Sequence, residues 1–330
     1  ILEQVRHPFP VAGRELSVSC SIGMVVEDRG VEDPDECLRE GDVAMYRAKA
    51  RGRNCFEVFR HNSDTDLRGR LDLEIELREA IDREELELHY QPVVSVVSGA
   101  ITGVEALVRW RHPIRGLVPP GDFIPLAEES GLVLPLGAWV LEEACRQAKA
   151  WTDGHRGVED LVVSVNLSPR QFRQPDLVEQ VAAVLARTGL QAGRLCVEVT
   201  EGVMVDDVEA AITTLRGLKA LGVRVAIDDF GTGYSSLSYL KRFPIDYVKI
   251  DRAFIRGLGE ETVDSEIVRS VIRLAAAIGI SAVAEGVETE DQLRRLRELD
   301  CPLVQGFLLA KPQLPADIEI LLDRRMTAAV

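Results

Sequence analysis

The chain has 330 residues, of which 46% are hydrophobic, and a formal net charge of -15. This length is enough for a sizeable core, either as two domains or as one barrel with an additional segment. The negative charge argues against a general nucleic-acid-binding protein, which needs a basic surface to displace counterions from phosphates. A small anionic substrate stays compatible with this charge when bound metal ions supply positive charge locally.

The cysteines and histidines give no sign of a conventional metal or disulfide site. The six cysteines lie far apart without a Cys-x-x-Cys pair, and the five histidines are scattered. This distribution favours reduced thiols in a cytoplasmic protein. The sequence has no apolar run of membrane-spanning length and no visible signal peptide. It begins at Ile1 rather than at a methionine, which leaves open an upstream membrane or sensor region.

Residues 1–60 predict a small β-loop-α-β unit. Strands are expected over Val18–Met24 and Cys55–Phe59, with a helix over Asp35–Ala50 between them. Gly52 follows this helix at a position suited to a left-handed C-cap. A unit of about sixty residues is near the lower limit for independent folding.

Two segments of this unit resemble the C-terminal end of a GGDEF, or diguanylate cyclase, domain. They are Val18-Ser19-Cys20-Ser21-Ile22-Gly23 and Ala44-Met45-Tyr46-Arg47-Ala48-Lys49, the latter continued by Gly52-Arg53-Asn54. The loop that names this family and carries its catalytic acids is absent from the sequence. The resemblance therefore implies a fragment without cyclase activity that serves as a docking or linker remnant. A regulatory role, in which the fragment senses GTP, stays open.

The remainder predicts an α/β fold of the TIM-like (β/α)8 barrel type. We expect a polar linker over 61–70, a helix over Leu67–Arg83 and the barrel domain over 71–330. Eight apolar segments predict strands, over Leu86–Val94, Ile101–Trp110, Leu161–Leu167, Leu195–Thr200, Val223–Asp228, Tyr247–Asp251, Ser281–Glu285 and Leu303–Phe307. Helical patterns lie between most of them, over Leu136–Ala150, Leu177–Thr188, Val208–Leu221, Thr262–Ile278 and Thr289–Leu299. Such an alternation over about 250 residues is typical of this barrel.

The first two predicted strands depart from the regular barrel plan. Only Val96–Ala100 separates them, and this segment is too short for a crossover helix. The two strands should therefore form an antiparallel hairpin, while the other strands run parallel.

Polar side chains gather at one end of the predicted strands. Because a strand places alternate residues on one face, Glu105, Leu107 and Arg109 should point together into the barrel mouth. Acids, amides and a lysine occupy the corresponding ends of the later strands, namely Asn166, Glu198, Glu201, Asp228, Asp229, Lys249, Asp251, Glu285, Glu288 and Gln305. Such groups are costly to bury unless they are paired or bind metal. Ligands that offer only oxygen suit Mg²⁺ or Mn²⁺, and two ions are expected.

Asp228 and Asp229 are adjacent, so a regular strand would point them to opposite faces. For both to reach a metal ion, the strand must end between them or twist there. Gly231 and Gly233 follow, and they give the next loop freedom to move with metal, substrate or dimer state. In isolation the pair is also consistent with a simple turn, which Asp favours.

Glu105-Ala106-Leu107 is the signature of the EAL-domain cyclic-di-GMP phosphodiesterases, and the chain resembles this family from about Leu71 to Leu322. The similarity continues in His89-Tyr90-Gln91-Pro92, Asn166-Leu167-Ser168, Glu198-Val199-Thr200-Glu201, Asp228-Asp229-Phe230-Gly231-Thr232-Gly233, Val248-Lys249-Ile250-Asp251, Ala284-Glu285-Gly286-Val287-Glu288 and Gln305-Gly306. The resemblance implies a barrel with one antiparallel first strand, in agreement with the short hairpin.

The resemblance also implies roles for individual residues. One divalent metal ion would bind Glu105, Asn166, Glu198 and Asp228, and a second would bind Asp228, Asp229 and Glu285, with Asp228 bridging. Lys249 would orient the attacking water or stabilise charge on the phosphate, Glu285 is also the candidate general base, and Gln305 would complete the catalytic group. The implied substrate contacts are Gln91, Leu107 and Arg109. Glu201 would brace the loop after Asp229, and Glu288 would have a supporting or structural role.

The implied reaction is hydrolysis of cyclic-di-GMP to linear pGpG with Mg²⁺ or Mn²⁺, in a cytoplasmic protein that forms a homodimer through the barrel. The alternative is a catalytically silent module that binds the dinucleotide or a protein partner. Silent members of the family usually lack one of the acids, and this chain lacks none.

Overall fold

The computed structural model describes residues 9–11, 14–16, 20–25, 41–42, 44–45, 56–58, 73–155, 158, 160–231, 242–259 and 262–328. The chain divides into two compact units, Ile1–Glu76 and Leu77–Val330, and each is considered by itself. The domain boundaries expected from the sequence stay predictions. The described residues include no helix that is both long enough and apolar enough to cross a membrane.

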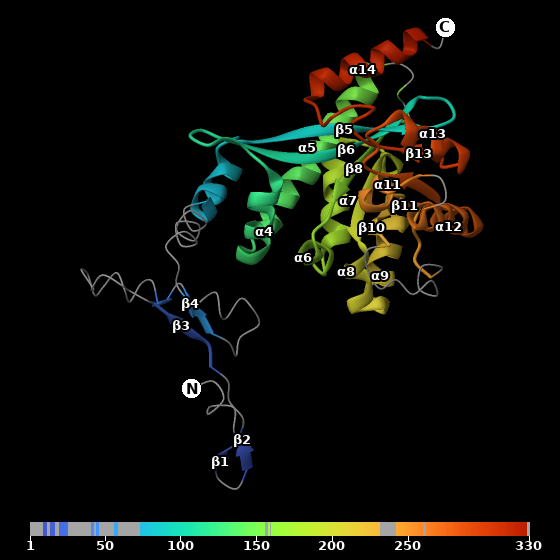
Figure 1. The fold of residues 1–330 in the computed structure, drawn as a ribbon. Coiled ribbons are helices and arrows are strands. Elements are labelled where there is room, and N and C mark those ends of the chain that lie inside the picture. The colour runs from blue at the N-terminus through green and yellow to red at the C-terminus, as the bar shows by residue number, and fades with distance from the viewer. Residues whose placement is uncertain are drawn as a thin grey trace. The chain divides into compact units, whose positions relative to one another are not determined.

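The first unit contains two pairs of short strands (Figure 1). β1 (Phe9–Val11) and β2 (Arg14–Leu16) are antiparallel, whereas β3 (Ile22–Met24) and β4 (Phe56–Val58) are parallel. Residues 41–42 and 44–45, between β3 and β4, are helical, as a parallel pair with a crossover requires. The β1–β2 hairpin was not predicted, because strands of three residues carry too short an alternation to recognise. The expected cap at Gly52 and the linker 61–70 lie outside the described residues.

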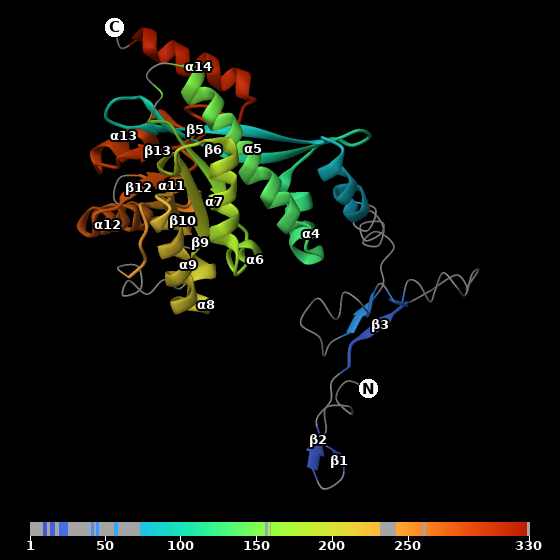
Figure 2. The same cartoon turned by 180° about the vertical axis from the view of Figure 1, so that it is seen from behind.

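The second unit is a closed barrel (Figures 1 and 2). Around the barrel its strands are β5 (Leu86–Ser95), β13 (Leu303–Val304), β12 (Ser281–Ala284), β11 (Tyr247–Ile250), β10 (Arg224–Phe230), β9 (Leu195–Thr200), β8 (Val162–Asn166) and β6 (Ile101–His112). The β5–β6 pairing closes the ring. β5 is antiparallel to both neighbours, and the remaining barrel pairs are parallel. The predicted TIM-like barrel with an antiparallel first strand is therefore confirmed.

Helices surround these strands (Figure 2). They are a helix over 73–82, α4 (Pro120–Ser130), α5 (Val133–Gly154), α6 (Pro169–Phe172), α7 (Leu177–Thr188), the 3₁₀ helix η1 (Ala192–Arg194), α8 (Glu201–Asp206), α9 (Val208–Ala220), α11 (Arg252–Arg256), α12 (Val263–Ile278), α13 (Glu290–Glu298) and α14 (Pro315–Ala328). α5, α7, α9, α12 and α13 are the five helices predicted between the strands, and the helix over 73–82 lies within the predicted helix Leu67–Arg83. Since helices cover the outside of the barrel, its strands are apolar on both faces, and the first five residues of β9 are all buried.

Two elements at the β6 end of the sheet differ from the prediction. β7 (Gly116–Val118) extends β6 by antiparallel pairing and is too short to be recognised from its pattern. α4 begins at Pro120 and contains Pro125, and prolines usually indicate a loop. A proline at the first helical position leaves no hydrogen bond unsatisfied, however, which explains why the helix begins there.

The last strand is shorter than predicted. β13 ends at Val304, whereas the expected strand reached Phe307. The Gln305 amide still pairs with the Ala284 carbonyl, but Phe307 is 55% exposed. The prediction from the apolar run was wrong here, because the final residues of the run leave the strand and turn outward at the barrel mouth.

Candidate functional site

The predicted residues meet at the end of the barrel where the parallel strands finish. A cavity of about 310 Å³ lies there, and nine of the predicted site residues line it, namely Gln91, Glu105, Leu107, Arg109, Asp228, Lys249, Glu285, Glu288 and Gln305. Asn166 and Asp229 line a neighbouring cavity that shares Leu107, Arg109 and Asp228 with the first. Side chains from strands far apart in the sequence thus form one polar group.

Lys249 lies at the centre of this group. Its Nζ atom is 2.6 Å from Glu285 Oε1, 3.3 Å from Asp228 Oδ1 and 3.4 Å from Glu105 Oε2, and it also contacts Glu198 Oε2. Only 3% of the lysine side chain is exposed. Burial lowers the pKa of Lys249, but the four surrounding carboxylates outweigh burial and raise it well above its ordinary value. The buried lysine therefore stays an ammonium ion that attracts all four acids.

Three amide side chains fix the orientation of Glu105. Asn166 Nδ2 donates to Glu105 Oε1 at 2.7 Å, and Gln305 Nε2 donates to Glu105 Oε2 at 2.7 Å. Gln305 Nε2 also donates to Gln91 Oε1 at 3.1 Å, and Gln91 Nε2 donates to the Ala310 carbonyl at 3.0 Å. Burial alone would raise the pKa of Glu105, but Lys249 and the two amides lower it below the usual value. Glu105 is thus held as an anion with both oxygens directed.

The strand irregularity that the adjacent acids require lies at Asp229. This residue has a left-handed backbone conformation, with φ at 52°, and the β10–β11 register shifts between Ile227 and Phe230. Left-handed geometry is uncommon for a residue other than glycine, although Asp tolerates it better than most. One oxygen from each of Asp228, Asp229 and Glu285 lies within 4.8 Å of the others. The local twist therefore brings both adjacent acids to the same side.

The excess of acids raises several pKa values. Burial, reinforced by Asp228 and Asp251, raises the pKa of Asp229 to about 6. Burial also raises the pKa of Glu285 to about 7, and Asp228 and Glu105 add to this against the opposing effect of Lys249. The pKa of Glu198 is raised mainly by burial as well. One lysine does not neutralise this many acids, and the group therefore favours the binding of further positive charge.

A divalent cation fits this donor set. Asp228, Asp229 and Glu285 supply clustered carboxylate oxygens, which are the ligands that Mg²⁺ and Mn²⁺ prefer. Glu105, Asn166 and Glu198 bring further oxygens to the same side of the barrel, where Asn166 and Lys249 hold the two glutamates. The residues present thus match a metal-binding group.

The remaining predicted residues border the group. Glu201 Oε2 accepts a hydrogen bond from the Gly231 amide at 3.2 Å, so Glu201 contacts the start of the loop after Asp229. Arg109 is half-buried, and its Nη1 donates to the Val108 carbonyl at 2.8 Å. Glu288 is exposed at the cavity edge. Gly233 lies outside the described residues.

Sequence reasoning missed other residues that line the cavity, namely Arg252, Gly286, Gly306, Phe307 and Pro312. The signal for Arg252 was present. It is the second residue after β11 and follows Asp251, so it lies close to a strand end, as the predicted acids do. Phe307 could not be found, because the apolar pattern placed it inside a buried strand.

Comparisons with known proteins identify related sequences over both parts of the chain. The model of the EAL domain family matches residues 74–312, and the model described as "Diguanylate cyclase, GGDEF domain" matches residues 1–55. A Pseudomonas aeruginosa protein named bifunctional diguanylate cyclase/cyclic di-GMP phosphodiesterase MucR is 43% identical over 317 residues, which cover 96% of this chain and 46% of that protein. The cyclic di-GMP phosphodiesterase NbdA of the same species is 40% identical over 320 residues, which cover 97% of this chain and 40% of NbdA.

The chain therefore spans about half the length, or less, of these curated relatives. A solved structure titled "PaMucR Phosphodiesterase, c-di-GMP complex" is 47% identical and has a TM-score of 0.72, covering 75% of this chain and 99% of that one. The EAL model alone covers more than half of the residues. The chain belongs to the EAL domain family and carries a short GGDEF fragment at its N-terminal side.

Proposed function

We propose that the chain hydrolyses cyclic-di-GMP to linear pGpG, with two Mg²⁺ or Mn²⁺ ions as cofactors. The observation that carries the proposal is the complete acidic group around Lys249, in which none of the expected acids is missing. The relatives named for cyclic-di-GMP hydrolysis and the related structure with this dinucleotide support the choice of substrate.

In this reaction a water oxygen forms a bond to phosphorus, the bond from phosphorus to the 3′ oxygen breaks, and a proton passes to the released 3′ oxygen. Divalent ions bound by the acids would lower the pKa of the water and stabilise charge on the phosphate. Glu285 would accept a proton from the water, because its carboxylate lies beside Asp228 and Asp229 in the candidate metal-binding group. Lys249 Nζ, fixed among four acids, holds the carboxylates in place and offers positive charge to the phosphate.

The substrate side of the proposal uses residues on the cavity wall. Arg109 offers a guanidinium to a phosphate oxygen, a charge-assisted contact that is stronger than a neutral hydrogen bond. Gln91 lies against Gln305 and lines the same wall, while Leu107 supplies an apolar surface to a guanine base. Glu201, which accepts a hydrogen bond from the Gly231 amide, would hold the start of the loop after Asp229 next to the acids.

The direct test is incubation of the purified chain with cyclic-di-GMP and Mn²⁺ or Mg²⁺, followed by chromatography of the nucleotides. We expect pGpG to accumulate, to disappear with a chelator, and to be lost in Glu105→Gln. The control Glu179→Gln changes an exposed acid on α7 and should keep full activity. Tight binding without turnover in either metal would instead favour a silent binding module.

We also propose a homodimer formed through the barrel, near the loop after Asp229. Residues 232–241 of that loop lie outside the described residues. The proposal rests on the family resemblance, and sedimentation velocity over a range of concentrations tests it. A single monomeric species at the highest concentration would contradict it.

A further inference from the structure

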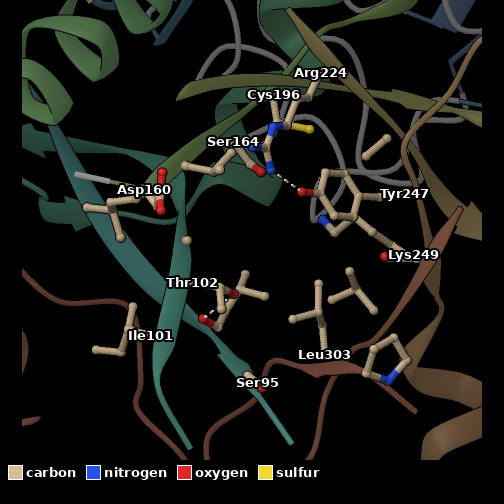
Figure 3. A pocket seen from close by; sticks show the side chains of 18 of the residues that line it. Ser95, Ile101, Thr102, Asp160, Ser164, Cys196, Arg224, Tyr247, Lys249 and Leu303 are labelled. Carbon is tan, nitrogen blue, oxygen red and sulfur yellow. Dashed lines mark hydrogen bonds between the residues drawn. The ribbon is translucent and has the colours of Figure 1, made fainter. Parts of the chain in front are cut away.

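A second cavity, shown in Figure 3, opens at the amino ends of the parallel strands. Lys249 lines both this cavity and the cavity of the candidate site. The volume of the second cavity is about 640 Å³. It lies in the range of about 300–1,000 Å³ that is typical of small-molecule sites.

The cavity occupies the layer directly beneath the candidate site. Its lining includes Gly103, Ser164, Cys196, Ala226, Tyr247 and Val283. Each of these residues lies two positions before a polar residue of the candidate site, which is on the same strand or, for Val283, directly after the strand end. Alternate residues of a strand share a face, so both sets point into the barrel. The layer is hollow because four of these six residues are Gly, Ser, Cys or Ala, which fill little space.

One side of the cavity presents hydrogen-bond donors. Arg224 Nη1 donates to Tyr247 Oη at 2.6 Å, as the dashed line in Figure 3 shows. Because the phenol oxygen accepts this bond, its own O–H stays available as a donor. Burial raises the pKa of Tyr247 although the nearby Arg224 lowers it, so the phenol keeps its proton. The two side chains together suit an anionic oxygen.

The positive charge of Arg224 also suits an anion. Among the charged residues of the lining, Asp160 pairs with Arg194 at 2.5 Å and Lys249 pairs with Glu198. Arg224 forms no salt bridge with any acid in the described part of the chain. The guanidinium is therefore the one lining charge without an opposite charge, counted over the described residues.

The other side of the cavity is largely aliphatic, with Thr102 and Ser95 also on it (Figure 3). Figure 3 shows Ile101 and Leu303 across the cavity from Arg224 and Tyr247. Val93 and Val283 also belong to the lining. A ligand that matches both sides carries an anionic group at one end and hydrocarbon at the other.

We propose that this cavity binds a small monocarboxylic acid with an apolar body, its carboxylate on Arg224 and Tyr247 and its hydrocarbon against the aliphatic side. Glu198 and Lys249 line this cavity and also belong to the acidic group above it. Occupancy of the lower layer is therefore linked to metal binding in the upper layer.

Calorimetric titration of the full chain with octanoate tests the site, with octanol as the uncharged probe. We expect octanoate to bind at one site and more tightly than octanol. Arg224→Gln should weaken octanoate binding by about tenfold or more, because a hydrogen bond to a charged group is lost. Arg187→Gln removes an exposed arginine of α7 and should bind octanoate like the unchanged protein.

Equal affinity for octanoate and octanol, or unchanged binding in a folded Arg224→Gln, would overturn the proposal. Should Arg224→Gln not fold by circular dichroism, Tyr247→Phe tests the same contact, and it should weaken octanoate but not octanol. These measurements need no hydrolysis, so they stand apart from the proposed activity. A Mn²⁺ titration with and without octanoate tests the link, since linked sites change each other's affinity equally. Identical Mn²⁺ affinities would show that the two layers are independent.

Discussion

At the scale of single residues, the site depends on one buried cation among several acids. Lys249 contacts four carboxylates, and each has an oxygen within 3.4 Å of its Nζ atom. Removing one partner of a buried charge group costs about 3–5 kcal/mol, because the remaining charges are left uncompensated. Lys249 is therefore expected to stabilise the barrel when no metal ion is present, in addition to any role in hydrolysis.

The substitution Lys249→Met tests this double role. We expect the metal-free protein to lose about 3–5 kcal/mol of unfolding free energy, and hydrolysis to fall by about 10²–10³. Urea unfolding with a chelator and the pGpG assay measure the two effects. Lys149→Met, which breaks a surface pair with Asp153, should cost no more than about 1 kcal/mol and leave hydrolysis unchanged. If Lys249→Met and Lys149→Met lost the same unfolding free energy and the same hydrolysis rate, Lys249 would have neither of the two roles.

The raised pKa values of two acids predict how stability depends on pH. Folding raises the pKa of Glu285 from 4.5 to about 7 and that of Asp229 from 3.8 to about 6. At a pH between the unfolded and the folded pKa of each acid, that acid keeps its proton in the folded chain and has lost it in the unfolded chain. The unfolding free energy of the metal-free protein should therefore fall as pH rises from about 4 to 7, by up to about 1.4 kcal/mol per pH unit for the largely buried Glu285 and by less for Asp229, because solvent screens its exposed carboxylate.

Urea unfolding at several pH values in a chelating buffer measures this slope. In Glu285→Gln the contribution of Glu285 is absent, so the decline between the unfolded pKa of 4.5 and the folded pKa of about 7 should be shallower. The exposed control Glu179→Gln should keep the original slope. The same slope in all three proteins would mean that Glu285 titrates normally in the folded chain.

The sequence was informative about residues of this kind. Acids and amides that follow or interrupt an apolar strand are recognisable without coordinates, and Glu105, Asp228 and Lys249 do meet in space. The hydrogen bonds of Asn166 and Gln305 to Glu105 were not foreseeable, because they join side chains from different strands. The hollow layer under the site was likewise hidden, since small residues in a strand do not reveal whether neighbours fill the space.

At the scale of elements, the short β5–β6 connection and the alternation of strands and helices were sufficient to predict the barrel and its antiparallel first strand. Val96–Ala100 allows only a hairpin, and the Ser95 amide indeed donates to the Ala100 carbonyl at 2.9 Å. The end of β10 was expected to be irregular because two adjacent acids must share one side. The sequence did not predict that Asp229 would be the left-handed residue. Either a strand end between the two acids or a twist would have brought both of them to one side.

The segment after β10 provides a test at this scale. Gly231 has φ at 99°, and a Cβ atom there would lie 3.0 Å from the Phe254 ring. A β-branched residue would therefore be strained by about 1–3 kcal/mol and would push the loop start away from Glu201. We expect Gly231→Val to slow hydrolysis by about tenfold or more while circular dichroism shows a folded barrel.

Gly99→Val is the matched control. Gly99 also has a positive φ, of 67°, but it lies in the β5–β6 turn, where a Cβ atom would meet nothing within 4 Å. Its strain should lower stability without slowing hydrolysis. Equal hydrolysis by both variants would remove the Gly231 loop from the mechanism.

At the scale of the whole molecule, the chain combines a barrel with a fragment of another family. The GGDEF model matches residues 1–55, and β3 and β4 of this part pair in parallel. The loop that names the GGDEF family and carries its catalytic acids is absent from the sequence. A fold fragment can persist without its chemistry, because strand pairing and catalysis depend on different residues.

The chain should therefore lack diguanylate cyclase activity. Incubation with GTP and Mg²⁺ should yield neither cyclic-di-GMP nor pGpG, the product into which the barrel would convert any cyclic-di-GMP formed. Running the assay with Glu105→Gln as well prevents such conversion from hiding a slow synthesis. Pyrophosphate release measures the cyclase step directly, because each new phosphodiester bond releases one pyrophosphate from GTP. Release above that of a protein-free control, accompanied by either nucleotide, would show that residues 1–55 retain a catalytic site that their sequence does not reveal.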